Sequence, residues 1–149
     1  MKLFTIGFTK KSAKEFFELL TNNDIKKLID IRLNNVSQLA GFSKGNDLKY
    51  FLKELCGIQY SHNVNLAPTK DILDDYKKKK ITWSQYEKSF IDLLDHRNIN
   101  DDLINYLERE IGGVCLLCSE STPENCHRRL VAEYINHKFP DFEIEIVHL

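Results

Sequence analysis

The side chains best suited to chemistry gather in one short segment, Cys118 to Arg128, whose sequence is CSESTPENCHR. This segment contains two thiols, an imidazole and a guanidinium. Within it, Thr122 followed by Pro123 predicts the N-cap and the first residue of a helix. The free amide groups and the positive dipole end of a helix start attract anions. The segment therefore predicts a site for a small anionic ligand around Cys126.

Several interpretations of these residues remain open. Cys126 is a candidate nucleophile, because a helix N-terminus and nearby cations lower the pKa of a thiol, and His127 would then be an acid or base. Alternatively, Cys118, Cys126 and His127, with or without His62, have the donor atoms of a metal site. The simplest interpretation is that the thiol and the imidazole only pack in the core.

A second group of polar residues is expected near the same place. Arg32 and Arg128 are suited to hold a phosphate or carboxylate, because a guanidinium binds such groups through two hydrogen bonds. Asp30 is either a general base or the partner of Arg32, and Glu120 is a candidate to orient His127 or Arg128. We assign candidate catalytic roles to Cys126, His127, His62, Asp30 and Glu120, and candidate substrate-binding roles to Gly7, Thr9, Arg32, Cys118 and Arg128.

The elements that must position these residues follow from the pattern of apolar side chains. Five short runs are typical of strands: residues 2–6, 27–32, 58–62, 114–118 and 142–147. The segments between and after them predict helices at 13–20, 47–55, 71–80, 83–96, 101–111 and 123–138. Strands that alternate with helices indicate a three-layer α/β fold, Rossmann-like or flavodoxin-like, with a mostly parallel sheet of about five strands.

The candidate residues follow the predicted strands, which agrees with the usual place of a binding site. Right-handed crossovers favour the strand order 3-2-1-4-5. In such sheets ligands bind outside the carboxyl ends of the strands, where the chain direction switches, here between the first and fourth strands. Cys115 and Cys118 have the spacing of a CxxC motif, but on a strand they face opposite sides. We therefore expect Cys115 to be a core residue.

Composition excludes several classes of protein. The chain has 149 residues, 42% of them hydrophobic and 29% charged, which predicts one globular domain over residues 1–149 rather than disorder. A net charge of −1 argues against broad nucleic-acid binding, and no apolar run is long enough to span a membrane. Four cysteines are too few for a disulfide framework, so we expect a cytosolic protein with free thiols. Cofactors and oligomeric state are not indicated.

Four motifs together resemble one known family. They are TIGFT at residues 5–9, IDIR at 29–32, the Tyr60-Ser61-His62 element, and LLCSESTPENCHRR at 116–129. This combination is similar to the domain of unknown function 488 family of small bacterial and archaeal proteins, and its C-x-E…C-H-R arrangement is the most specific part. The resemblance implies a fold and a set of motif positions but no reaction. The motif positions are Gly7, Asp30, Arg32, His62, Cys118, Glu120, Cys126, His127 and Arg128.

Two departures from the family pattern concern the first and third motifs. The family more often has His then Ser after the glycine of the opening motif, where this chain has Phe8 and Thr9. A histidine at that position therefore has no role here, although the Thr9 hydroxyl can replace the serine. Leu66-Ala67 stands where a Leu-Gly pair is usual.

The sequence leads to one main functional expectation and two alternatives. We expect a cytosolic enzyme that acts on a small anionic substrate, phosphorylated or nucleotide-like, at the carboxyl ends of the strands. One alternative is a non-catalytic module that binds a small ligand or a nucleic-acid end. The other is a protein that binds a metal through cysteine and histidine.

Overall fold

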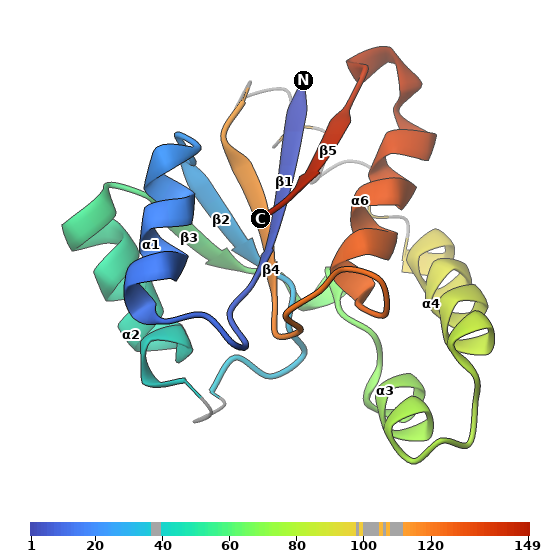
Figure 1. Ribbon diagram of the computed structural model, residues 1–149. Coiled ribbons are helices and arrows are strands. Elements are labelled where there is room, and N and C mark those ends of the chain that lie inside the picture. Colours follow the sequence, from blue (N-terminus) through green and yellow to red (C-terminus); the bar gives the residue numbers. More distant parts are fainter. Residues whose placement is uncertain (37–39, 98, 100–104, 106, 108–111) are drawn as a thin grey trace.

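A five-stranded parallel sheet forms the centre of the computed structural model, which describes residues 1–149 except 37–39, 98, 100–104, 106 and 108–111 (Figure 1). The strands are β1 (Lys2–Gly7), β2 (Lys27–Asp30), β3 (Gln59–His62), β4 (Val114–Cys118) and β5 (Glu145–His148). Their order across the sheet is β3-β2-β4-β1-β5, and every neighbouring pair is parallel.

The predicted order 3-2-1-4-5 is wrong in one respect, because β4 lies between β2 and β1. Every residue of β4 is buried, and a strand that is apolar on both faces is best covered at the centre of the sheet. The preference for adjacent placement of consecutive strands is only a tendency. β1 and β4 remain neighbours, and Gly7 pairs with Cys118 at their carboxyl ends.

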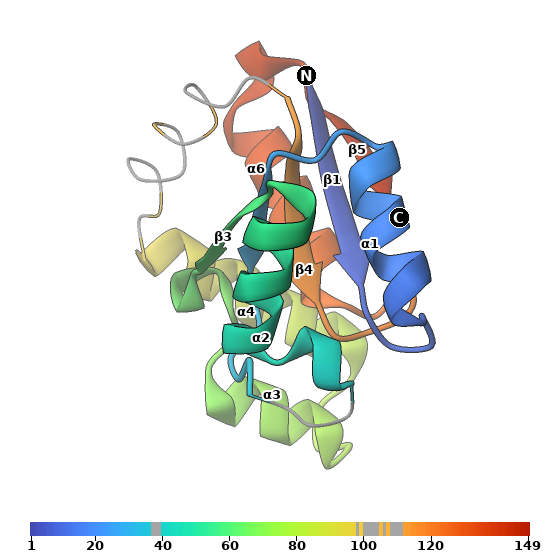
Figure 2. The same ribbon diagram turned by 90° about the vertical axis from the view of Figure 1, so that its left-hand side faces the viewer.

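Helices cover both faces of the sheet, which confirms the three-layer fold class. α1 (Ala13–Asn22) and α2 (Gly45–Phe51) lie on one face, and α2 continues as a π-helical turn at Leu52–Cys56 (Figure 2). The other face carries α4 (Trp83–Arg97) and α6 (His127–Lys138), with α3 (Lys70–Lys77) packed on α4 (Figure 1). Short 3-10 turns occur at Gly41–Ser43, Val64–Leu66 and Pro140–Phe142.

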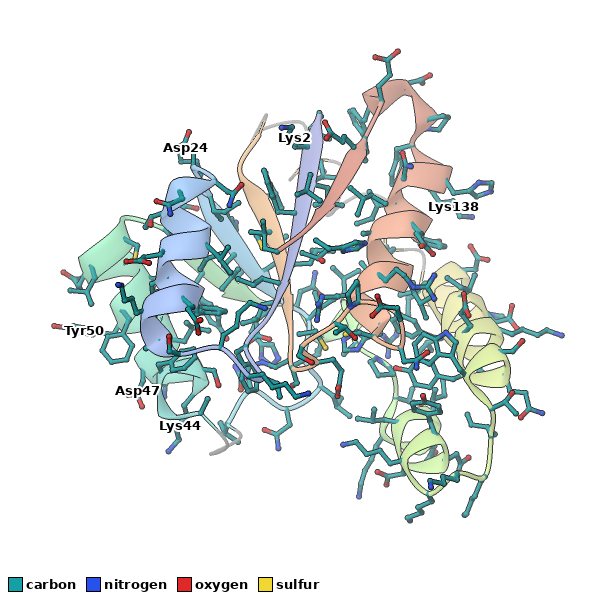
Figure 3. The ribbon with its side chains drawn as sticks, in the orientation of Figure 1. Lys2, Asp24, Lys44, Asp47, Tyr50 and Lys138 are labelled. Atoms are coloured by element: carbon teal, nitrogen blue, oxygen red, sulfur yellow. The ribbon has the colours of Figure 1, made fainter. Side chains whose placement is uncertain are left out.

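Two apolar clusters fill the spaces between the sheet and its helices. Side chains alternate between the faces along each strand, so that Leu116 belongs to one cluster and Leu117 to the other. Cys115 belongs to the cluster under α1 and α2, as expected for a core thiol. Figure 3 shows the polar periphery around this core, with the labelled side chains Lys2, Asp24, Lys44, Asp47, Tyr50 and Lys138.

Local signals explain most of the helix ends. Ser12 and Glu15 form a capping box at the start of α1, with a distance of 2.7 Å from the Ser12 amide to the Glu15 carboxylate. Gly57 has a φ of +66° and ends the helical segment that precedes it. The helix expected over 101–111 lies mostly outside the described residues. None of the described helices combines the length and apolar character needed to cross a membrane.

The start of α6 differs from the sequence prediction. The helix begins at His127 rather than Pro123, and its N-cap is Cys126 rather than Thr122. The Cys126 amide donates to the Pro123 carbonyl at 3.2 Å, so residues 123–126 form a turn, and the backbone of Cys126 is extended. His127 and Arg128 are therefore the first two residues of the helix, closer to its positive end than predicted.

Candidate functional site

The candidate residues converge at the carboxyl edge of the sheet, from the ends of three neighbouring strands and the start of α6. The register places Gly7 beside Cys118, and Asp30 beside both Leu117 and His62. The backbone amide of Thr9 donates to the Ser119 carbonyl at 3.1 Å and holds the loop after β4 next to the end of β1. Within this edge, the structure separates the side chains into two polar clusters.

The first cluster consists of Cys118, Cys126 and His127 and is called the thiol cluster below. The three possible ligand atoms lie within 4.8 Å of one another, and all three side chains are buried. Cys118 Sγ is 3.4 Å from His127 Nδ1. His127 Nε2 is 2.7 Å from the Ile31 carbonyl oxygen, an acceptor, so Nε2 carries a proton and donates it. The ring is therefore oriented with Nδ1 toward the thiol.

The two thiols differ in acidity. Burial alone would raise the pKa of Cys118, but hydrogen bonds from Cys126 and from the amides of Ser119 and Glu120, together with the charge of Arg128, outweigh it and lower the pKa. The hydrogen bond to Cys118, together with burial, raises the pKa of Cys126. In this arrangement Cys126 donates the hydrogen bond between the two thiols and Cys118 accepts it.

Arg128 lies beside the thiol cluster and is fully buried. Its Nη1 donates to the Glu120 carbonyl oxygen and is 3.8 Å from Cys126 Sγ, whereas Nε and Nη2 are buried without a hydrogen-bond acceptor. Glycine at position 7 is required, because a Cβ there would overlap the Glu120 carbonyl and lie 2.6 Å from Arg128 Nη1. Glu120 contributes its backbone carbonyl to this contact, and Glu120 as a whole is exposed to solvent.

The second group consists of Asp30, Arg32 and Tyr60 and is called the Asp–Arg cluster below. Arg32 donates to both Asp30 oxygens, from Nε at 2.8 Å and from Nη2 at 2.6 Å, and both residues are buried. The Tyr60 hydroxyl donates to Asp30 Oδ2 at 2.7 Å. Of the two roles left open for Asp30, the geometry supports pairing with Arg32. Arg32 Nη1 is buried without an acceptor.

No role is predicted from the sequence for Tyr60, which belongs to the Tyr60-Ser61-His62 motif, or for Tyr86, yet each lies at one of the two clusters. Burial, followed by the charge of Asp30, raises the pKa of Tyr60 to about 12. Tyr86 belongs to the core, but it lies close enough to Cys118 and Cys126 for their charges to raise its pKa further after the effect of burial. The sequence could have indicated that Tyr60 lies near the site, because Tyr60 precedes the candidate residue His62 by two positions and therefore shares its side of β3.

His62 lies apart from the thiol cluster. It is exposed, and its Nε2 is 2.7 Å from the Arg32 carbonyl oxygen. The group of possible metal ligands among the described residues contains Cys118, Cys126 and His127 without His62. The candidate ligand set from the sequence is thus reduced to three side chains.

Basic groups from two further elements face Arg128. Burial and the charge of Arg128 lower the pKa of Lys11 and of His148. His148 Nδ1 lies 2.6 Å from the Thr5 hydroxyl, next to the end of β1. A hydrogen bond from Thr122 and, more weakly, the charge of Arg128 lower the pKa of Glu124, so an acidic group also lies near this guanidinium.

Comparisons with known proteins identify the family. A curated relative, Myosin-8 from Arabidopsis thaliana, is 30% identical over 114 residues, which is 71% of this chain but only 7% of that protein. No solved structure matches the chain. The family model described as "Domain of unknown function DUF488" matches residues 12–135, a range that contains both polar clusters. The chain therefore belongs to the DUF488 family.

Proposed function

We propose that this protein is an enzyme that acts on a small anionic substrate at the edge between β1 and β4. The observation that carries the proposal is the pair of buried guanidinium groups of Arg32 and Arg128, which retain N–H donors without an acceptor. A buried donor without a partner costs about 1–3 kcal/mol, and more when it is charged. Such donors therefore favour a ligand that supplies the missing acceptors.

The two arginines differ in charge balance. Asp30 neutralises Arg32, which leaves that guanidinium a single free donor atom. Among the described residues, no carboxylate lies within ion-pair distance of Arg128, which keeps two free donor atoms at the positive end of α6. An anion bound to Arg128 would supply both the acceptors and the missing negative charge.

The reactive groups of the proposed enzyme lie next to this anion position. Cys126 is 3.8 Å from Arg128, and Cys118 and His127 complete the thiol cluster. We propose this cluster as the reactive centre of the enzyme, with Gly7, Thr9 and Glu120 shaping the adjoining loop and His62 at the exposed rim. All four cysteines are free, which supports a reducing compartment such as the cytosol.

Thermal shift measurements test anion binding directly. Inorganic phosphate, pyrophosphate and AMP are added to the full chain, with sodium chloride at equal ionic strength as reference. We expect the phosphorylated probes to raise the unfolding temperature, because a ligand of the folded state stabilises it. Arg128→Met should remove the shift. Arg129→Met is the matched control, because Arg129 instead pairs with Glu133 at 2.9 Å.

Two results would overturn anion binding: no shift with the wild-type chain, or an unchanged shift in a folded Arg128→Met variant. Methionine replaces a buried charge by an apolar chain of similar length, so this variant is expected to fold. Catalysis is tested separately by incubating the protein with nucleotides and phosphate monoesters and separating the products. Binding without turnover of any of them would favour the non-catalytic binding module.

A further inference from the structure

The thiol cluster has the donor set of a metal centre as well as that of a reactive thiol. Its donors come from the end of β4, the N-cap of α6 and the first residue of α6, and they converge within 4.8 Å in the protein interior. Thiolate sulfur and imidazole nitrogen are the ligands that zinc prefers. Cys115, in the same strand, is buried among apolar side chains of the opposite face and serves as an internal example of an ordinary core thiol.

The orientation of His127 fits a metal ligand. Its Nε2 donates to the Ile31 carbonyl at 2.7 Å, which leaves Nδ1 available on the side of Cys118. A metal-bound histidine usually donates its other ring N–H to a carbonyl or carboxylate in this way. The separation of 3.4 Å between Cys118 Sγ and His127 Nδ1 agrees with about 3.5 Å for sulfur and nitrogen ligands on one tetrahedral zinc ion.

The position of Cys126 also favours a ligand role. An N-cap side chain normally accepts a hydrogen bond from the first turn, which is why serine, threonine, aspartate and asparagine are preferred there. Cys126 is the N-cap of α6, but its side chain makes no such capping bond. The thiol instead lies with Cys118 and His127 and within 3.8 Å of Arg128 Nη1. Neighbouring donors of this kind commonly support metal-bound thiolates.

We propose that Cys118, Cys126 and His127 bind one Zn²⁺ ion and leave a fourth coordination position for an exogenous ligand. Three protein ligands with an open position are typical of catalytic zinc rather than structural zinc. Two thiolates balance the charge of the ion, so the positive charge of Arg128 remains and favours an anion in the fourth position. Only this last step rests on the proposed function; the three-ligand site stands without it.

Metal analysis of the full untagged chain tests the site. We expect close to one zinc per chain by mass spectrometry after dialysis against a mild chelator, because all three ligands are buried. After metal removal under reducing conditions, titration with Co²⁺ should produce thiolate-to-cobalt charge-transfer bands and the visible bands of tetrahedral cobalt. Cys118→Ala and Cys126→Ala should each lose stoichiometric binding, whereas Cys115→Ala should bind like the wild type.

Two results would overturn the metal site. One is a wild-type chain that holds no stoichiometric zinc and gives no charge-transfer bands with Co²⁺. The other is retention of one ion by both cysteine variants. If the variants fail to fold, the charge-transfer bands of the wild-type chain with Co²⁺ test the site alone, because these bands arise only from thiolate ligands of the metal. Phosphate binding by metal-free protein is measured in parallel, so that failure of the zinc site and failure of anion binding are distinguished.

Discussion

The Asp30–Arg32 pair provides the most quantitative test of how this edge of the sheet is held together. Asn at position 30 keeps the shape of the side chain but removes its charge. The Arg32 guanidinium, which is 2% exposed, then loses its counter-charge, and one of its two N–H donors faces an amide group instead of a carboxylate oxygen. The Tyr60 hydroxyl also loses a charged acceptor.

The expected cost of Asp30→Asn follows from these contacts. Removal of one partner of a buried ion pair costs about 3–5 kcal/mol, because the other charge stays buried without compensation. Total stability is about 5–15 kcal/mol for a typical protein. With a shift of roughly 2–4 °C per kcal/mol in a chain of this size, we expect the unfolding temperature to fall by roughly 6–20 °C.

Urea denaturation of wild type and variants measures this cost. Asp75→Asn is the matched control, because Asp75 pairs with Lys80 at 3.7 Å on the surface, where such a pair contributes about 0–1 kcal/mol. Replacing both Asp30 and Arg32 by apolar residues should recover part of the lost stability, since no unpaired charge remains. If Asp30→Asn costs no more than Asp75→Asn, the pair does not stabilise the site as argued.

Two further predictions concern single residues of the site. Gly7→Ala should destabilise the fold by about 3 kcal/mol, because the new Cβ overlaps the Glu120 carbonyl and crowds Arg128; unchanged urea denaturation would contradict this. The pKa of about 12 for Tyr60 lies above the usual 10, so the fold favours the neutral phenol, and its contribution to stability should be lost as pH rises from 10 to 12. The ultraviolet titration curve of the wild type minus that of Tyr60→Phe should show one phenol that ionises near pH 12. Ionisation of this phenol near pH 10 would refute the burial argument.

The fold class could be predicted because it depends on local periodicity. Strand and helix patterns alternate along the chain, and the run at 114–118 is apolar at every position, which is typical of a strand covered on both faces. The position of that strand between β1 and β2 could not be predicted, because the order of neighbouring strands depends on how the helices pack on both faces of the sheet. β1 and β4 are neighbours in both the predicted and the observed order. Both orders therefore place the candidate residues at the carboxyl ends of these two strands.

The composition of the site was predictable, whereas its geometry was not. The segment CSESTPENCHR predicts that the thiols, His127 and Arg128 lie after the strand at 114–118 and near a helix start. The helix begins four residues later than predicted, because residues 123–126 form a turn, and this makes Cys126 the N-cap. The contrasting environments of Cys118 and Cys126 depend on Arg128 and on the amides that follow β4, contacts that spacing alone does not specify.

The most direct test of anion binding is an NMR titration of the arginine side chains, which is practical because the chain contains only five arginines. Each arginine Nε–H gives its own NMR signal in a ¹⁵N-labelled sample, and Arg128→Met identifies the signal of Arg128. Titration with inorganic phosphate or pyrophosphate should shift this signal and slow its exchange with water, because Arg128 Nε lacks an acceptor in the protein. The signal of Arg129 should stay in place. An Arg128 signal that does not respond to either anion would contradict the proposed site.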